Sequence, residues 1–378
     1  MSSKIRFVEE AAQAGANVSA LCRKYEISRQ TGHKWIKRFK AHGYEGLDEQ
    51  SRRPDSSPLI TAEDLIAALL VEKAKHPRWG ARKLQLLLMR RFGEHAPKER
   101  TVARILKRFD LVRRRRKRRG LSVVERAPHV VAAAPNDVWT IDFKGWWRTA
   151  DGARCNPLTV RDALSRYVLA VELLPRCGVD EVREVMVRLF RRCGVPKTIQ
   201  CDNGPPFISV QAAAGLSKLS AWWVSLGIQI VRSRLASPQD NGAHERMHVD
   251  LAGDLQAIPA ATRPLQQRAC SRWRQEFNHV RPHDALKGKT PADVYRASPT
   301  RPRVLALPYP PNWKILRIMT NGSIRINGEA RFISTALSGY YVGLESLQGF
   351  RYRVWLYAVE LCEVESAPSV RTISRLAS

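Results

Sequence analysis

The chain has 378 residues, of which 44% are hydrophobic, so it is long enough for two or three domains with packed cores. Lys and Arg number 64 against 35 Asp and Glu, and the resulting formal charge of +29 predicts a polyanionic partner, DNA or RNA, over a merely soluble basic surface or a ribosome-associated role. No apolar run approaches the ~18 residues that span a bilayer, no signal peptide is evident, and the seven scattered cysteines favour neither a disulfide framework nor a structural zinc, so we expect a cytoplasmic protein with no membrane partner.

Residues 1–50 are predicted to form a helix-turn-helix module, with helices over 4–14, 18–25 and 29–42. In the third helix Trp35, Ile36 and Phe39 are expected to face the core. The exposed side chains, which would contact DNA bases and phosphates, are then Arg29, Gln30, Thr31, His33, Lys34 and Lys37. Gly32 counts against this interpretation, because an internal glycine costs a helix about 1 kcal/mol relative to alanine. A small helical bundle with a solvated basic face is the alternative.

A second helical module is predicted over residues 58–112, after a segment rich in Pro and Ser. Apolar residues recur at helical spacing over 61–77, 80–92 and 99–112. The last of these resembles a second DNA-reading helix, with Arg100, Thr101, Arg104 and Lys107 as its contacts. A plain three-helix bundle fits this pattern nearly as well.

A basic linker is predicted over residues 113–134. It opens on seven consecutive cations, Arg113, Arg114, Arg115, Arg116, Lys117, Arg118 and Arg119. Such a run repels itself and stays extended until it meets phosphate, where it releases counterions and makes binding salt-dependent. A targeting signal is the alternative.

From residue 135 the pattern changes to a mixture of strands and helices. The predicted elements are strands over 138–147 and, as a hairpin, 156–175, a helix over 178–194, a strand over 196–204, a helix near 216–226, a strand over 227–234 and a helix over 241–258. The order β-β-β-α-β-α-β-α begins as an antiparallel meander and continues with crossovers. It predicts an α/β core with a mixed five-stranded sheet flanked by helices.

Two acids in this core are candidates for chemistry. Asp142 lies in an otherwise aromatic and apolar strand, where a buried charge is costly unless a metal or cation offsets it. Asp202 follows a strand and is therefore expected at the rim of the sheet. With an acid from a neighbouring helix they would form an oxygen-ligand site suited to Mg²⁺. On spacing alone, an Asp at a strand end is more often a turn former or a cap.

The helix over 241–258 carries the third candidate. Its apolar stripe is predicted to consist of Ala243, Met247, Leu251 and Leu255. Glu245 points away from this stripe and is eligible as a ligand. Asp240 is expected to cap the helix, and Asp250 to be a bystander.

Four runs, TIDFKGWW, IQCDNGPPF, NGAHER and FNHVRPHDALKGKTPADVY, occur in this order within residues 135–297. Together they resemble the catalytic core of the DDE transposases and retroviral-type integrases, especially bacterial insertion-sequence transposases. The resemblance implies a ribonuclease-H-like fold. It also implies a centre of two Mg²⁺ (or Mn²⁺) ions, held by Asp142, Asp202 and Glu245, that activates water to nick a transposon end before the freed 3′-hydroxyl attacks target DNA.

Other residues in or near these motifs are expected to have structural roles. The resemblance assigns Asn203 and Gly204 to a tight turn and to substrate approach. Asp162 also matches a familiar acidic position, but pairing with Arg166 or capping the hairpin is expected for it. Two features depart from the family pattern: the interval from the second Asp to the Glu is long, and the zinc-binding module of retroviral integrases is absent, with the helical modules in its place.

Residues 312–366 alternate polar and apolar side chains, with hairpin turns at 321–322 and 327–328. They predict a small all-β barrel of SH3-like type, which in similar transposases helps to hold DNA or neighbouring subunits; a barrel that only stabilises the core is the alternative. The leading hypothesis is a transposase acting as a homo-oligomer on two double-stranded DNA ends, with a need for an accessory ATPase left open. A non-catalytic DNA-binding protein with an integrase-like scaffold and a ribonuclease-H-type nuclease are the alternatives.

Overall fold

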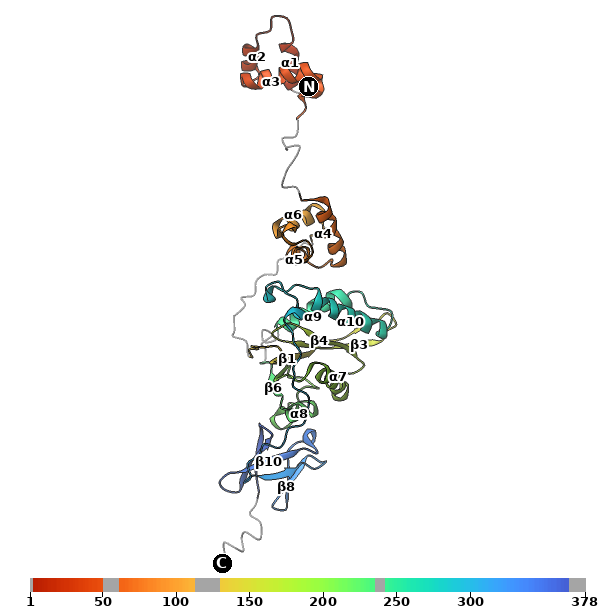
Figure 1. Ribbon diagram of the computed structural model, residues 1–378, viewed down its shortest axis with the longest axis vertical. Helices are drawn as coiled ribbons and strands as arrows, with labels where there is room; N and C mark the ends of the chain where they lie inside the picture. Colours follow the sequence, from red (N-terminus) through yellow and green to blue (C-terminus); the bar gives the residue numbers. More distant parts are fainter. Residues whose placement is uncertain (1–2, 50–60, 113–129, 235–241, 367–378) are drawn as a thin grey trace, which may run out of the picture. The chain divides into compact units, whose positions relative to one another are not determined.

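The computed structural model describes residues 3–49, 61–112, 130–234 and 242–366 (Figure 1). The chain divides into two compact units, Met1–Glu63 and Asp64–Ser378. The basic run at 113–119, Asp240 and most of the predicted linkers lie outside the described residues.

The first unit contains helices α1 (Ser3–Ala11), α2 (Val18–Lys24) and α3 (Arg29–His42), as the sequence predicted. The N-caps explain where two of them begin. The Asn17 side chain accepts hydrogen bonds from the first backbone amides of α2, and the Ser28 side chain accepts one from the amide of Thr31. Phe7 and Cys22 form the buried centre, against which Trp35, Ile36 and Phe39 pack, as predicted.

Gly32 supports the helix-turn-helix packing, so its interpretation as evidence against that packing was wrong. It is buried on α3, and a Cβ at this position would lie 2.6 Å from Cys22 Sγ and 2.8 Å from Phe7 Cζ. No real Cβ approaches other atoms so closely. The glycine therefore lets α3 approach the other two helices, at the expense of helix propensity.

Gly32→Ala is expected to destabilise this unit by about 1–3 kcal/mol, because overpacking outweighs the ~1 kcal/mol gain in helix propensity. Hydrogen exchange of the α1–α3 amides in the full chain measures the change. Lys34→Ala, an exposed substitution on the same helix, is the control and should leave exchange close to that of the wild type. Slower exchange in Gly32→Ala would contradict the packing argument.

The second helical module, which begins the second unit, consists of α4 (Glu63–Lys75), α5 (Ala81–Phe92) and α6 (Glu99–Arg108). Its core comprises Leu69, Trp79, Leu84, Leu88, Val102, Ile105 and Leu106. On α5 and α6 the buried positions are three or four residues apart, and on α4 Leu69 follows the partly buried Ile66 by three residues, whereas Trp79 lies between α4 and α5. This spacing is why the sequence pattern predicted all three helices.

The central sheet contains β1 (Val138–Phe143), β2 (Trp147–Arg148), β3 (Arg154–Asp162), β4 (Val168–Leu174), β5 (Thr198–Cys201) and β6 (Gln229–Arg232). The long strands lie in the order β4-β3-β1-β5-β6, and the two-residue β2 pairs with β3. Pairing is antiparallel from β4 to β1 and parallel from β1 to β6. The predicted meander followed by crossovers is confirmed, with β2 as a sixth, short strand.

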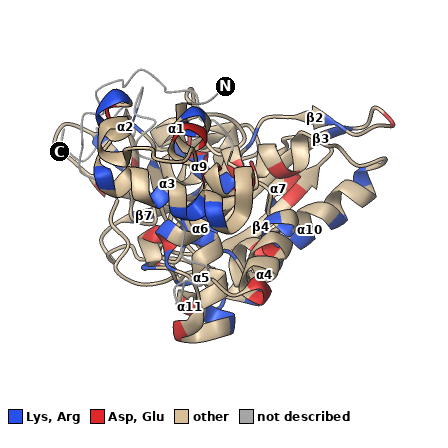
Figure 2. Ribbon diagram, turned by 90° about the horizontal axis from the view of Figure 1, so that it is seen from above, with Lys and Arg blue, Asp and Glu red and all other residues tan. Residues whose placement is uncertain are grey.

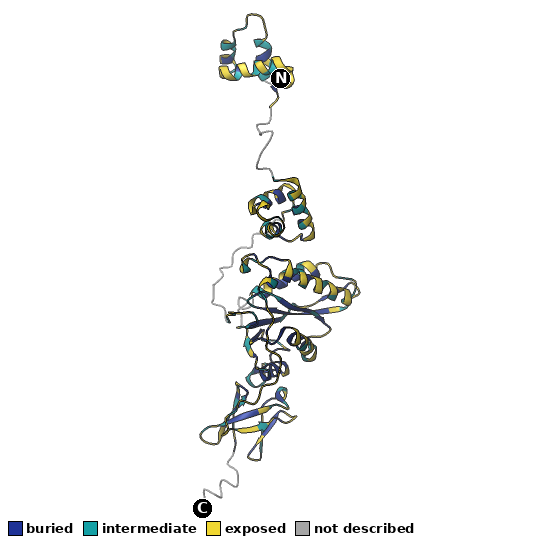
Figure 3. Ribbon diagram, viewed as in Figure 1, coloured by how far each residue is buried: buried dark blue, intermediate teal, exposed yellow. Residues whose placement is uncertain are grey.

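Helices cover both faces of this sheet. On one face α7 (Val179–Cys193) and α8 (Lys218–Ser225) bury an apolar layer against β1, β3 and β5. On the other face α9 (Gly242–Leu251), its π-helical extension η5 (Ala252–Gln256) and α10 (Arg263–His279) pack against β4 and β3. Figure 1 shows the two layers, and Figure 3 shows mostly buried strands between them.

The hairpin between β3 and β4 turns around Asp162, which is fully buried. Its carboxylate accepts hydrogen bonds from the backbone amides of Ser165 (2.8 Å) and Asn136 (2.7 Å) and from the Ser165 hydroxyl (2.5 Å). Arg166 occupies the left-handed region of the turn, with φ 63°. The capping role is therefore confirmed, because these donors occupy both carboxylate oxygens.

After α10 come η6 (Asp284–Leu286) and α11 (Pro291–Val294), and then two antiparallel sheets. One contains β7 (Lys314–Arg317), β10 (Tyr341–Ser346), β11 (Arg351–Leu356) and β12 (Val359–Glu365), and the other β8 (Ser323–Ile326) and β9 (Glu329–Phe332). They share one apolar core, to which Ala221 and Val224 of α8 also belong. The strands are confirmed; a closed barrel stays a prediction.

Candidate active site and DNA-reading helices

Asp142 and Asp202 lie at the same edge of the sheet. In the parallel pair of β1 and β5, Val138 is opposite Thr198 and Thr140 is opposite Gln200. Continued by two residues, this register sets Asp142, near the end of β1, opposite Asp202, which directly follows β5. The sheet thus aligns two acids 60 positions apart at its carboxyl edge.

The direction of the Asp142 side chain follows from strand alternation. Ile141 belongs to the apolar layer under α7 and α8. Its neighbours Thr140 and Asp142 therefore point to the opposite face, where α9 lies. The Asp142 side chain is 22% exposed there.

The three candidate acids act on one another electrostatically. Burial, then the negative charge of Asp202, then that of Glu245 raise the pKa of Asp142 to about 7. Glu245 is exposed in the first turn of α9, and Asp202 is exposed at the strand end. A cation at this edge would reduce the repulsion that raises the pKa of Asp142.

The acids do not form a compact ligand cage. Within the described ranges, no three His, Cys, Asp or Glu side chains lie close enough together to hold a metal ion. The segment 235–241, which leads into α9 and Glu245, is outside those ranges. The donor chemistry fits Mg²⁺, which prefers carboxylate oxygens, but Glu245 would have to come closer to the two aspartates.

Asn203 and Gly204 shape the turn after Asp202. The Asn203 side-chain amide donates to the Ser233 carbonyl oxygen at 2.8 Å, which ties the end of β5 to the segment after β6. The Gly204 amide lies 3.3 Å from an Asp202 carboxylate oxygen, and a Cβ on Gly204 would come equally close to the other oxygen. Both residues thus restrict the position of the Asp202 carboxylate.

The sequence interpretation missed a buried network beneath Asp142. Thr159 lies opposite Asp142 in the β1–β3 register. Its hydroxyl lies 3.0 Å from the Asp142 carbonyl oxygen, 2.6 Å from His244 Nε2 and 2.8 Å from His248 Nε2. Thr140 Oγ1 lies 2.7 Å from His244 Nδ1. The available signal was the pair His244 and His248, four residues apart and hence on one face of α9.

One assignment of protons satisfies this network. The Thr159 hydroxyl donates to the Asp142 carbonyl, so its lone pairs accept from Nε2–H of His244 and of His248. His244 Nδ1 then accepts from the Thr140 hydroxyl, for which the Arg161 carbonyl oxygen, at 3.4 Å, is the more distant acceptor. Burial supports the neutral rings that this requires: it lowers the pKa of His244 well below its usual value and that of His248 to about 3. The network holds the backbone of Asp142 through neutral hydrogen bonds.

The predicted DNA-reading residues of α3 are largely exposed. Arg29, His33 and Lys37 recur every four residues along one side of the helix, and Gln30 and Lys34 are also exposed. Thr31 is half-buried, and its hydroxyl lies 2.9 Å from that of Ser28 within the N-cap.

On α6, Arg100, Arg104 and Lys107 are exposed at four- and three-residue spacing, opposite the buried Val102, Ile105 and Leu106. Thr101 is half-buried. Figure 2 marks the Lys and Arg positions of α3 and α6 in blue. Each helix thus presents one basic side that its own module leaves uncovered.

Models of known protein families match most of the described chain. A helix-turn-helix domain matches residues 3–54 and a homeodomain-like domain residues 31–106. The integrase core domain matches residues 132–238 and, through a second model, 226–291. A protein of insertion element IS407 from Burkholderia multivorans is 32% identical over 253 residues, which cover 66% of this chain and 86% of that protein. The chain belongs to the DDE transposase/integrase family.

Two further proteins are similar to this chain. A protein of insertion element IS476 from Xanthomonas euvesicatoria is 25% identical, over 79% of this chain and 83% of its own length. The HTLV-2 integrase catalytic core domain in complex with magnesium is 17% identical, with a TM-score of 0.33, and covers 44% of this chain and 100% of its own. This structural similarity is too low to add to the family assignment. Among the described residues of this transposase/integrase family member, no helix is long and apolar enough to cross a membrane.

Proposed function

We propose that the chain is a DNA transposase that binds the terminal repeats of a mobile element and catalyses nicking and 3′-hydroxyl strand transfer. The observation that carries the proposal is the alignment of Asp142 and Asp202 at one sheet edge, with Glu245 close enough to contribute to the raised pKa of Asp142. The sequence motifs around these residues make the same three the expected acids.

Asp142, Asp202 and Glu245 would hold the metal, two Mg²⁺ or Mn²⁺ ions in the proposal. When bound, the ions would supply a water nucleophile and stabilise the charge that develops on the attacked phosphate. The chain's own contribution is to hold the carboxylates: the Thr159 network fixes the backbone of Asp142, and Asn203 fixes the turn that carries Asp202.

The helical modules would recognise DNA through the exposed sides of α3 and α6, and the basic run at 113–119 would add sequence-independent phosphate contacts. We propose that the protein acts in the bacterial cytoplasm as a homo-oligomer that bridges two DNA ends. The β strands of residues 312–366, as a barrel, would help to hold DNA or a neighbouring subunit.

Two other functions make different predictions. A non-catalytic DNA-binding protein with an integrase-like scaffold would bind the element ends without cleaving them. A ribonuclease-H-type nuclease would hydrolyse nucleic acid without joining it. The presence of all three acids favours an enzyme, and two DNA-reading modules favour a transposase over a simple nuclease.

The test is Mg²⁺-dependent cleavage and joining of a labelled duplex that carries the element's end. Glu245→Gln is expected to reduce both reactions at least about a thousandfold, because loss of a metal ligand removes several kcal/mol of transition-state stabilisation. Glu184→Gln, an exposed substitution on α7 across the sheet, is the matched control and should leave both reactions unchanged.

Each outcome selects one function. Nicked and joined products from the wild type alone support the transposase, and their formation by purified protein would show that no accessory ATPase is needed for these steps. Binding without cleavage would support the scaffold, and cleavage without joining the nuclease. Cleavage by Glu245→Gln at the wild-type rate would refute the assignment of Glu245.

A further inference from the structure

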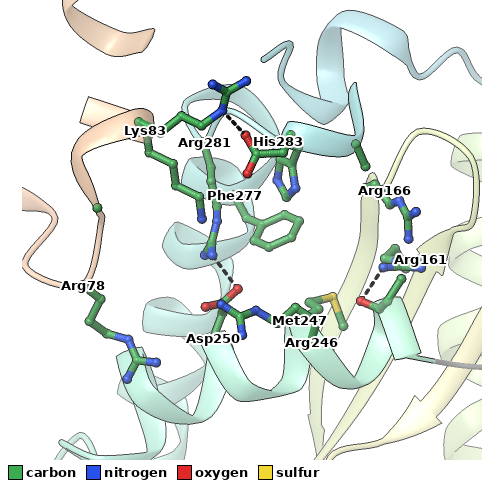
Figure 4. Close-up of a pocket in the computed structure, with 15 residues that line it drawn as sticks. Arg78, Lys83, Arg161, Arg166, Arg246, Met247, Asp250, Phe277, Arg281 and His283 are labelled. Carbon is green, nitrogen blue, oxygen red and sulfur yellow. Dashed lines mark hydrogen bonds and ion pairs between the residues drawn. The ribbon is translucent and has the colours of Figure 1, made fainter. Parts of the chain in front are cut away.

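A basic cavity of about 480 Å³ lies between α5, α9, α10 and the β3–β4 turn (Figure 4). Seven of its lining side chains are Lys or Arg and only two are acids, Asp250 and Asp284. Both acids already have partners: Asp250 pairs with Arg281, and Asp284 lies 2.6 Å from Arg82 Nε. The acids therefore leave most of the positive charge in this cavity uncompensated.

The remaining cations include groups without an ion pair among the described residues. Lys83, Arg166 and Arg246 have no acidic partner there, and Arg161 donates only to the Ala243 carbonyl oxygen, at 2.7 Å. Arg246 directly follows Glu245 on α9.

Two buried guanidinium groups in the cavity have an N–H with no partner. Arg161 is 3% exposed and Arg281 6% exposed, yet Nε of each has no hydrogen-bond acceptor in the described structure. An unsatisfied buried N–H costs about 1–3 kcal/mol, and more on a charged group. Both side chains line the cavity, so an anion bound inside it would offset their charge.

The positive charges in the cavity also repel one another. Burial and the charge of Arg281 lower the pKa of Lys83 to about 8, and burial and the charge of Arg166 lower that of Arg161 to about 9. An anion at this position would reverse both electrostatic effects. Phosphate fits best, because its oxygens match the planar, forked donors of arginine.

We propose that this cavity binds a phosphate group, and that the bound phosphate fastens the second helical module to α9, the helix that carries Glu245. Ion pairs already join the two sides of this boundary: His76 Nδ1 lies 3.0 Å from a Glu276 carboxylate oxygen, and Arg78 Nε lies 3.1 Å from one of Asp254. Arg90 also lies 3.4 Å from a carboxylate oxygen of Asp293. The cavity is larger than one phosphate requires. It has room for an attached nucleoside, so the source is either a DNA strand or a free anion.

Lys83→Met tests the proposal in metal-free, full-length protein. Lys83 is half-buried on α5 and makes no described hydrogen bond, so its removal deletes a cavity charge without leaving a partner unsatisfied. Melting temperatures are measured at constant ionic strength against orthophosphate, against the dinucleoside phosphodiester TpT, and against uncharged thymidine. Lys98→Met, an exposed substitution in the same module outside the cavity, is the matched control.

We expect orthophosphate or TpT to stabilise the wild type and Lys98→Met equally, and Lys83→Met to need at least about tenfold more ligand for the same shift. Lys83→Arg should retain the response. General exclusion of phosphate from protein surfaces raises all four melting temperatures alike and cancels in the comparison. A response to TpT identifies a strand phosphate as the ligand, and a response to orthophosphate alone a free anion.

Hydrogen exchange tests the fastening. The bound ligand should slow exchange of the α5 amides in the wild type and have a weaker effect in Lys83→Met. The proposal is overturned by the absence of any ligand response in the wild type, or by an equal response in Lys83→Met. Because neither readout involves cleavage, the result is independent of whether the chain nicks DNA.

Discussion

Asp142→Asn is expected to abolish Mg²⁺-dependent nicking and at the same time to stabilise the metal-free protein. The pKa of the Asp142 carboxyl rises from 3.8 to about 7 on folding, mainly through burial and the charge of Asp202. A shift of this size corresponds to about 4 kcal/mol against the ionised form. With the side chain 22% exposed, we expect a realised gain of about 1–2 kcal/mol for the neutral asparagine at pH 8.

The pH dependence has a definite sign. Below pH 3.8 the carboxyl is protonated in both the folded and the unfolded state, so the substitution should change stability little. Between pH 3.8 and about 7 the folded state binds more protons than the unfolded state, and the wild type loses stability as the pH rises. Above pH 7 the difference between the proteins should be constant, with Asp142→Asn the more stable.

Chemical denaturation in chelator at pH 4 and pH 8 measures this difference, and Asp180→Asn, an exposed substitution at the start of α7, is the control. Added Mg²⁺ should stabilise the wild type but not Asp142→Asn, because the ion offsets the charge that raises the pKa. A wild type that is more stable than Asp142→Asn in chelator at pH 8 would contradict the electrostatic argument. Function and stability then place opposite demands on this residue.

The sequence was informative about the acids for a specific reason. Asp202 follows a predicted strand and Asp142 lies within another, and strands can be located from local composition and alternation. The resemblance then selected these acids and Glu245 from several eligible ones. The pairing register of β1 with β5, which aligns Asp142 with Asp202, is a long-range property that no local pattern contains.

The supporting residues could not be predicted in the same way. Helical periodicity places His244 and His248 on one face, but it does not say that Thr159 of a distant strand lies opposite. Arg161, near the end of β3, is buried where α9 covers it and offers the Ala243 carbonyl. Asp250, predicted to be a bystander, pairs with Arg281 for the same reason: the partner comes from another part of the chain, just after α10. Each of these residues depends on packing between elements.

Thr159→Val is expected to impair the candidate active site, because the Thr159 hydroxyl holds the backbone of Asp142 in place. The substitution removes the one hydroxyl that both accepts from two histidines and donates to the Asp142 carbonyl. It leaves buried polar groups unpaired at about 1–3 kcal/mol each, so we expect a loss of about 3 kcal/mol in the free energy of unfolding. Thr159→Ser keeps the hydroxyl and should lose less than about 1.5 kcal/mol.

Stability alone does not separate positioning from packing, so the deciding readout is the Mg²⁺ concentration that gives half-maximal nicking, measured well below the melting temperature. A loosened Asp142 backbone weakens metal binding, and a loss of about 1.4 kcal/mol raises that concentration tenfold. Thr159→Ser should restore the wild-type value, and duplex binding should be equal in all three proteins because α3 and α6 are untouched. If Thr159→Val loses stability but keeps the wild-type Mg²⁺ dependence, the network only packs α9 onto the sheet. If the required Mg²⁺ concentration rises in Thr159→Val and returns to the wild-type value in Thr159→Ser, then Thr159, His244 and His248 are positioning residues that hold Asp142 for metal binding.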